Sequence, residues 1–322
     1  MRETDIRLRK TDGIGAPFRV GVWAVPGFAL MSYACTVEPL RAANLLAQRP
    51  LYEVVHFGDA ASSGSAAVSA DLPVGAMASL DLLLVVAGGD PFTGGDEAFD
   101  WLRKMDRAGV RIGGVSGGSV LLARAGLMDG RRMTVHWEHG PPLAEQHPDL
   151  MIEKRLYVID RDRVTCGGGT APLDMMHALI AGDHGHVFAR LVMDWFLHTD
   201  VRAAAAPQRA GLAERMGVHS PHLVSAIAAM EDHIADPLAL DQLALIAGVS
   251  GRHLNRLFTD VLGQSAMNYY RNMRLDVGHR MIRGSALPIS EIGRATGFAT
   301  PAHFTNAYTR RYGHSPRSAR AA

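Results

Sequence analysis

The chain has 322 residues, of which 48% are hydrophobic and 20% are charged, and its net charge is +1. These values are typical of a folded globular protein with a substantial core, and the length favours two domains. The N-terminus is charged and no apolar run is long enough to cross a membrane, so we expect neither a signal peptide nor a membrane anchor. Two cysteines, Cys35 and Cys166, are too few for a disulfide framework and favour a reducing cytoplasm.

The first two hundred residues alternate between strand and helix patterns. Short apolar runs that end in Pro, Gly or polar residues predict buried strands at 19–25, 51–57, 81–87 and 110–115. Helical spacing predicts helices at 29–48, 99–108 and 119–125. This alternation predicts an α/β domain with a parallel, doubly wound sheet. The composition then shifts over 201–220, which we interpret as a linker, and everything from Pro221 onward has helical patterns.

The carboxyl-terminal part contains two similar turn-centred segments, 248–258 and 297–308. At an offset of 50 the second repeats the first, with these aligned pairs: Leu254/Phe304, Phe258/Tyr308, Gly263/Gly313 and Ser265/Ser315. The duplication predicts two helix–turn–helix units in an all-α domain. Two such units suit two successive major grooves of double-stranded DNA.

In the first unit, Gly248 permits a sharp turn and Ser250 is placed to cap the next helix. The apolar spacing turns Leu254 and Phe258 inward, so the remaining positions are candidates to face DNA: Ser250, Gly251, Arg252, His253, Asn255 and Arg256. Arginine can bond bidentately to guanine and asparagine to adenine. In the second unit the candidates are Thr300, Ala302, His303, Thr305 and Asn306. This set is less basic, so we expect phosphate contacts and DNA shape to dominate there.

Charge is unevenly divided along the chain. Residues 221–322 carry eleven Arg, no Lys and seven acidic side chains, a net charge of +4, whereas residues 1–220 have a net charge of −3. From Ser250 onward the net charge is +8. Positive charge that coincides with a duplicated helix–turn–helix favours attraction to DNA phosphates over an ordinary solvated surface.

At these residues the chain resembles the AraC/XylS family of transcriptional regulators. The resemblance covers about 221–320, including the stretches Gly297–Phe304 and Tyr312–Arg317. It implies two helix–turn–helix subdomains joined by a long helix, here at about 264–282. It also implies RNA polymerase as a partner. It implies base recognition by the first helix–turn–helix unit, which supports Arg252 and Arg256 as residues that contact DNA.

A second motif lies in the first domain, where Gly114-Val115-Ser116-Gly117-Gly118 follows a strand and opens a helix. It matches the G-x-S-x-G nucleophile elbow of serine hydrolases. In that fold the histidine lies far downstream of the serine, whereas His136 is only twenty residues on. The motif alone is weak evidence for catalysis, and a serine-dependent hydrolase or amidase remains the alternative.

Residues 18–195 resemble PfpI-like members of the class I glutamine amidotransferase superfamily, in the branch fused to AraC-type domains. The matching stretches are 38–44, 88–89, 114–118, 127–137 and 165–168. Catalytic relatives have a cysteine at the elbow, activated by a histidine and approached by a carboxylate. Here Ser116 occupies the cysteine position, Glu38 corresponds to the carboxylate, and His136 is expected nearby.

Replacement of the thiol by a hydroxyl predicts a pocket that binds rather than reacts, because a serine needs a well-placed base. Backbone N–H groups at Gly117 and Gly89 would suit a carboxylate, while Glu38, Trp137 and Phe92 would suit a cationic nitrogen. The predicted pocket comprises Glu38, Gly89, Phe92, Ser116, Gly117, His136 and Trp137. The histidines lack metal-ligand spacing, so we expect neither a metal nor a cofactor.

These observations predict a flavodoxin-like, amidotransferase-like α/β domain at 18–200 for ligand sensing and dimerisation, a linker at 201–220, and an AraC-type domain at 221–320. The expected protein is a homodimeric transcriptional regulator and not an enzyme. We expect it to activate a catabolic operon on binding a small amino-acid or quaternary-amine effector. A constitutive DNA-binding protein whose first domain serves only for dimerisation is a further alternative.

Overall fold

The computed structural model describes residues 16–321 except 59–60, 64, 92–94, 210–219 and 286. The chain divides into two compact units, Met1–Gln208 and Arg209–Ala322. Both predicted fold classes are confirmed, an α/β unit followed by a helical one. Among the described residues, none of the helices combines the length and apolar character needed to cross a bilayer.

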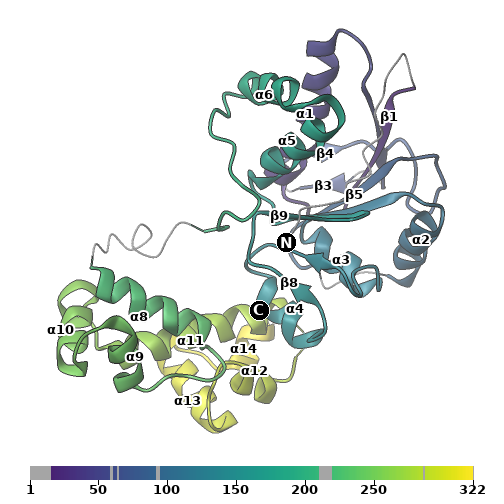
Figure 1. The fold of residues 1–322 in the computed structure, drawn as a ribbon. Helices are drawn as coiled ribbons and strands as arrows, with labels where there is room; N and C mark the ends of the chain where they lie inside the picture. Colours follow the sequence, from purple (N-terminus) through teal and green to yellow (C-terminus); the bar gives the residue numbers. More distant parts are fainter. Residues whose placement is uncertain are drawn as a thin grey trace. The chain divides into compact units, whose positions relative to one another are not determined.

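The first unit is built on a six-stranded sheet with the order β2-β1-β5-β6-β10-β9 (Figure 1). Its strands are β1 (Phe18–Ala24), β2 (Tyr52–Phe57), β5 (Leu82–Ala87), β6 (Arg111–Ser116), β9 (Tyr157–Asp160) and β10 (Arg163–Cys166). All neighbours are parallel except β9, which pairs antiparallel with β10 at the edge. The predicted parallel sheet is therefore confirmed, with one reversed edge strand.

Helices cover both faces of this sheet, which makes three layers (Figure 1). One face packs against α1 (Leu30–Ala47), α5 (Ala171–His184) and α6 (His186–Trp195). The other packs against α2 (Asp96–Arg107) and α3 (Gly118–Arg124). Because both faces are covered, a central strand such as Leu82–Ala87 is apolar and buried at every position. Shorter elements complete the unit: β3 (Ala61–Ser62), β4 (Ala67–Val68), β7 (Arg132–Met133), α4 (Gly140–Gln146) and β8 (Met151–Ile152).

Residues 201–208, which we call the strap, belong to the first unit and not to the linker expected from 201. The backbone N–H of Arg202 donates to the buried Asp174 carboxylate at 2.8 Å. The Arg202 guanidinium donates to the same carboxylate. The carbonyl of Ala204 accepts from Leu156 N–H at 3.1 Å. Composition indicated a loop here, but composition carries no information about such long-range hydrogen bonds.

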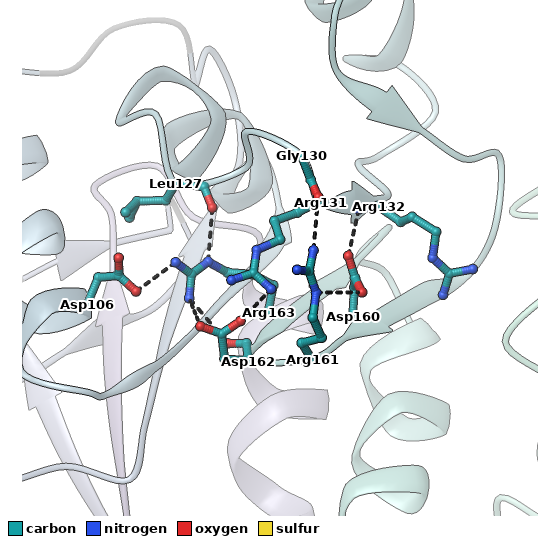
Figure 2. A network of polar contacts seen from close by, with 9 residues as sticks. All are labelled: Asp106, Leu127, Gly130, Arg131, Arg132, Asp160, Arg161, Asp162 and Arg163. Atoms are coloured by element: carbon teal, nitrogen blue, oxygen red, sulfur yellow. Dashed lines mark hydrogen bonds and ion pairs between the residues drawn. The ribbon is translucent and has the colours of Figure 1, made fainter. Parts of the chain in front are cut away.

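A polar network holds the β9–β10 turn against α2 and the segment after α3 (Figure 2). The side chain of Arg163 is 5% exposed and reaches Asp106 at 2.6 Å and Asp162 at 2.9 Å. Its Nε also donates to the carbonyl of Leu127 at 2.9 Å. Arg161 lies at the outer side of the same turn, with a half-exposed side chain that reaches Gly130.

The second unit consists of helices arranged around two cores. In chain order they are α8 (Pro221–Asp232), α9 (Leu240–Ala247), α10 (Gly251–Leu262), α11 (Ala266–Gly284), α12 (Ile289–Ala295), α13 (Pro301–Tyr312) and α14 (Pro316–Ala321). The first core contains Leu254 and Phe258, and the second contains Phe304 and Tyr308. The long helix α11 contributes to both cores, which agrees with the connecting helix expected at about 264–282.

Two contacts fix the helix–turn–helix subdomains to each other. The Arg274 guanidinium of α11 lies 4.4 Å from the Phe298 ring centroid and 5.8 Å from that of Tyr270, which belong to different cores. Gly297 has φ 71°, and a Cβ there would lie 2.7 Å from the carbonyl oxygen of Ile234. The subdomains therefore form one rigid platform rather than two independently moving units.

Arg163→Ala should lower the free energy of unfolding by about 3 kcal/mol, because removal of a buried arginine deprives the Asp106 carboxylate of its ion pair and leaves Asp162 with Arg131 alone. Arg161→Ala is the matched control, and its cost should stay below about 1 kcal/mol because that side chain is largely exposed. Urea denaturation of the full chain, followed by circular dichroism, measures both. Equal costs would contradict the assignment.

Gly313→Ala should cost about 1 kcal/mol, because an alanine at φ 77° is strained but meets no atom within 4 Å. Gly297→Ala has similar strain and adds the steric clash with Ile234, so it should cost more and also weaken DNA binding. Denaturation and gel retardation of the two variants test this difference. Retention of full DNA affinity by Gly297→Ala would show that the rigid platform is not required.

Candidate ligand pocket and nucleic-acid interface

The elbow at Ser116 is a tight strand-to-helix turn whose glycines allow close approach. Ser116 has φ 57° and is 6% exposed. A Cβ at Gly118 would lie 1.9 Å from the carbonyl oxygen of Val85, and one at Gly114 would lie 2.5 Å from the Ser119 nitrogen. Helix α3 can begin directly against the sheet only because these positions lack side chains. The local geometry is therefore that of a nucleophile elbow.

The elbow presents a hydroxyl, which needs a general base to act as a nucleophile. Within the described part of the chain, no imidazole is hydrogen-bonded to Ser116. The Nδ1 of His136 instead lies 3.9 Å from a carboxylate oxygen of Glu138. Burial lowers the pKa of His136, and burial together with His136 lowers the pKa of His139 to about 4. Both rings are therefore neutral at pH 7.

The helix α1 side chain that approaches the elbow is Ser32 and not Glu38. A Cβ at Gly168 would lie 2.9 Å from Ser116 Oγ and 3.0 Å from Ser32 Oγ, so both hydroxyls border one small space. Glu38 is half-exposed and pairs with Arg41 at 2.6 Å. Six residues separate Ser32 from Glu38, which corresponds to about 9 Å along a helix. The expected role of Glu38 in the pocket is therefore wrong.

A pocket of about 220 Å³ lies next to the elbow, within the first unit. It is lined by His136, Trp137, Leu156, Gly167, Gly168, Gly169, Thr170, Ala171, Arg202 and Gln208. Of the predicted pocket residues, His136 and Trp137 are in this set, whereas Ser116 and Gly89 are outside it. Gly117 donates its N–H to the Ala87 carbonyl at 3.1 Å and so cannot serve a ligand as expected. Phe92 lies outside the described residues.

Sequence reasoning missed the wall formed by the start of α5 and by the strap. Residues Gly168–Ala171 place the N-terminus of this 14-residue helix at the pocket, where its dipole favours negative charge. Arg202 lines the same wall while it binds the fully buried Asp174, which also bonds to His198 at 2.9 Å. The run Thr165-Cys166-Gly167-Gly168 is part of the resemblance to the PfpI-like family, and its two glycines are the signal of a close backbone approach at this wall.

The two thiols do not contribute reactive groups. Cys166 is fully buried, and burial raises the pKa of its thiol to about 12. Burial raises the pKa of Cys35 as well. Over the residues that the structure describes, no three His, Cys, Asp or Glu side chains are grouped so that they could hold a metal ion.

On helix α10 the candidate DNA-facing residues fall into two groups. Arg252 and Arg256 are exposed, and Arg256 Nη2 lies 3.0 Å from His253 Nδ1. Ser250 caps the helix by accepting from His253 N–H at 3.2 Å, as expected, and Gly251 is half-buried beside it. Asn255 differs from expectation, because its Oδ1 accepts from Ala266 N–H at 3.0 Å and so positions the start of α11. Its carboxamide oxygen is therefore committed within the protein.

On helix α13 the candidate DNA-facing residues include no arginine. Thr300 caps it by accepting from His303 N–H at 3.1 Å. Ala302, His303 and Asn306 are exposed, whereas Thr305 is half-buried. The His303 ring packs edge-on against Phe298 at 5.4 Å, which restricts its orientation.

Comparison with known proteins agrees with both halves of this description. Residues 31–182 match the DJ-1/PfpI family and residues 243–322 match a helix-turn-helix domain. The chain is 47% identical over 310 residues to the HTH-type transcriptional regulator GlxA of Rhizobium meliloti, which covers 94% of this chain and 95% of that one. It is 38% identical over 302 residues to the HTH-type transcriptional regulator CdhR of Pseudomonas aeruginosa. That alignment covers 92% of this chain and 90% of CdhR.

A solved structure shows the same fold in the first unit. The crystal structure of an AraC family transcriptional regulator from Pseudomonas putida superposes with a TM-score of 0.51 and 25% identity, over 56% of this chain and 100% of that one. These similarities extend over nearly the whole length of the related regulators. The chain belongs to the AraC-type helix–turn–helix transcriptional regulators that carry an N-terminal DJ-1/PfpI domain.

Proposed function

We propose that this regulator activates a catabolic operon when a small amino-acid-type effector occupies the pocket beside Ser116. The observation that carries the proposal is the combination of an elbow without an aligned base and an adjacent pocket of about 220 Å³. A pocket of this volume suits a small metabolite. The scaffold of an enzyme is kept, while the geometry favours binding.

The pocket wall suits a ligand with a carboxylate. The N-terminus of α5 and the Arg202 guanidinium both favour negative charge at one side. At the other side, His136 and Trp137 offer aromatic faces, which can hold apolar or cationic groups. An amino acid or a methylated-amine acid has this combination of groups.

An effector can change transcription at the promoter only if it binds one arrangement of two subunits more tightly than another. We propose a homodimer formed through the first unit. An exposed apolar stripe on and after α6 supports this, formed by Val187, Leu191, Trp195 and Leu197. RNA polymerase is the expected partner at the promoter. Analytical ultracentrifugation of the full chain measures the oligomeric state, and a monomer at all concentrations would contradict the dimer.

The rival function is a serine-dependent hydrolase or amidase, which the strained elbow at Ser116 favours. It requires a general base within hydrogen-bond reach of the hydroxyl. Hydrolysis of ester or amide substrates that is abolished by Ser116→Ala would establish it.

Arg252→Ala and Arg256→Ala should each weaken binding to the cognate operator by about 1–3 kcal/mol if the side chain reads a base. Gel retardation on operator and random DNA separates the two roles. An equal loss on both DNAs would assign the arginine to phosphate contact. Arg161→Ala, in the first unit, is the charge-matched control and should leave DNA binding unchanged.

Amino acids and betaines should be screened by thermal shift against the full chain. A ligand at a hundred times its Kd should stabilise the first unit by about 2.7 kcal/mol, which corresponds to a rise in Tm of roughly 5–10 °C. Ser116→Ala should keep both the ligand response and the promoter output, because the hydroxyl does no chemistry in this proposal. If no compound stabilises the protein, the constitutive alternative is favoured.

A further inference from the structure

The last residue of the first unit, Gln208, inserts its side chain into the pocket wall. Its Nε2 donates to Arg155 O at 2.7 Å, to Val135 O at 2.9 Å and to Thr134 Oγ1 at 3.0 Å. Its Oε1 accepts from Trp137 N–H at 2.8 Å. The carboxamide therefore fills a site that contains both kinds of hydrogen-bonding partner.

The fit around this carboxamide is close. A Cβ at Gly167 would lie 2.7 Å from Gln208 Cδ, so only glycine allows the side chain to reach its position. The strap that carries Gln208 is tied down further back by Arg202 and Ala204. Such a set of contacts is more than an exposed connecting segment needs.

The site around Gln208 Nε2 has a definite chemical preference. Two backbone carbonyls and one hydroxyl converge on a single nitrogen, so this end of the pocket selects a group with N–H donors. A primary ammonium, a guanidinium or a carboxamide can satisfy these acceptors. A trimethylammonium group has no N–H and cannot.

We propose that Gln208 is a built-in occupant of the effector pocket, and that an amino-acid effector displaces it by placing its own N–H-donating group at the same acceptors. This proposal rests on the effector function proposed above and narrows it to ligands that carry N–H donors. Each neutral hydrogen bond contributes about 1 kcal/mol net, so the occupant is held firmly enough to close the site and weakly enough to be displaced.

Displacement would change the chain that leads to the second unit. With Gln208 released and Ala204 still bonded to Leu156, four more residues, 205–208, join the connection. Fully extended, four residues span about 14 Å, which widens the positions that the DNA-binding unit can occupy. Ligand binding would thus break the Gln208 contacts and lengthen the connection between the first and second units.

The test compares the full-length wild type with Gln208→Ala. Hydrogen exchange at the Trp137 amide reports directly on the Gln208 contact, because that N–H donates to Gln208 Oε1. Isothermal titration with L-glutamine, L-arginine and glycine betaine measures ligand affinity. We expect faster Trp137 exchange and at least about tenfold tighter binding of an N–H-bearing probe in Gln208→Ala, because the competing occupant is gone.

Two further variants serve as controls for the effect of Gln208→Ala. Gln208→Glu keeps the size but directs an oxygen at the carbonyls of Val135 and Arg155, so it should also speed Trp137 exchange. Pro207→Ala changes the exposed neighbouring residue and should leave exchange and affinity at wild-type values.

The outcomes separate this proposal from the function on which it rests. Equal or weaker probe binding by Gln208→Ala would overturn the displacement while leaving the sensor intact, because Gln208 would then be part of the ligand site. Unchanged Trp137 exchange in both Gln208 variants would also overturn it. Tighter binding of glycine betaine alone would overturn the N–H requirement. No binding of any probe by either protein would overturn the displacement and the amino-acid sensor together.

Discussion

One buried carboxylate organises the pocket end of the first unit of this regulator. Asp174 is fully buried on α5 and binds the backbone and guanidinium of Arg202 as well as the ring of His198. A buried charge is tolerated only when it is paired and hydrogen-bonded, so these partners are held in place. They anchor the strap against α5, and the strap in turn delivers Gln208 to the pocket. The pocket wall therefore depends on this carboxylate.

The elbow at Ser116 and the pocket beside it share the same close backbone packing. Glycines at 114, 118 and 168 let two strand ends and two helix N-termini approach within van der Waals distance. That geometry remains useful when the nucleophile is a hydroxyl without an aligned base, because the helix N-terminus still favours an anion. Arg274 of the second unit and Gln208 of the first have different roles, since Arg274 joins two subdomains and Gln208 joins the strap to the pocket wall.

Local pattern was sufficient for most of the fold. A short apolar run followed by glycines, such as Leu82–Ala87, favours a strand covered on both faces, and the i, i+4 pairs Leu254/Phe258 and Phe304/Tyr308 favour helices that face a core. The pocket was harder to predict. Glu38 was favoured by its charge and family position, but it lies about two turns of helix beyond Ser32, whose small hydroxyl gives no signal in sequence.

The sequence by itself determined the two domain classes, the duplicated helix–turn–helix and the exposed arginines of α10, because periodicity and charge are local properties. Only the tertiary structure decided which side chains share the pocket and that Asn255 bonds within its own domain. It also decided that the supposed linker begins with a segment bound to the first unit. These features depend on hydrogen bonds between residues far apart in the chain, such as Gln208 and Thr134, and no local pattern encodes such a pairing.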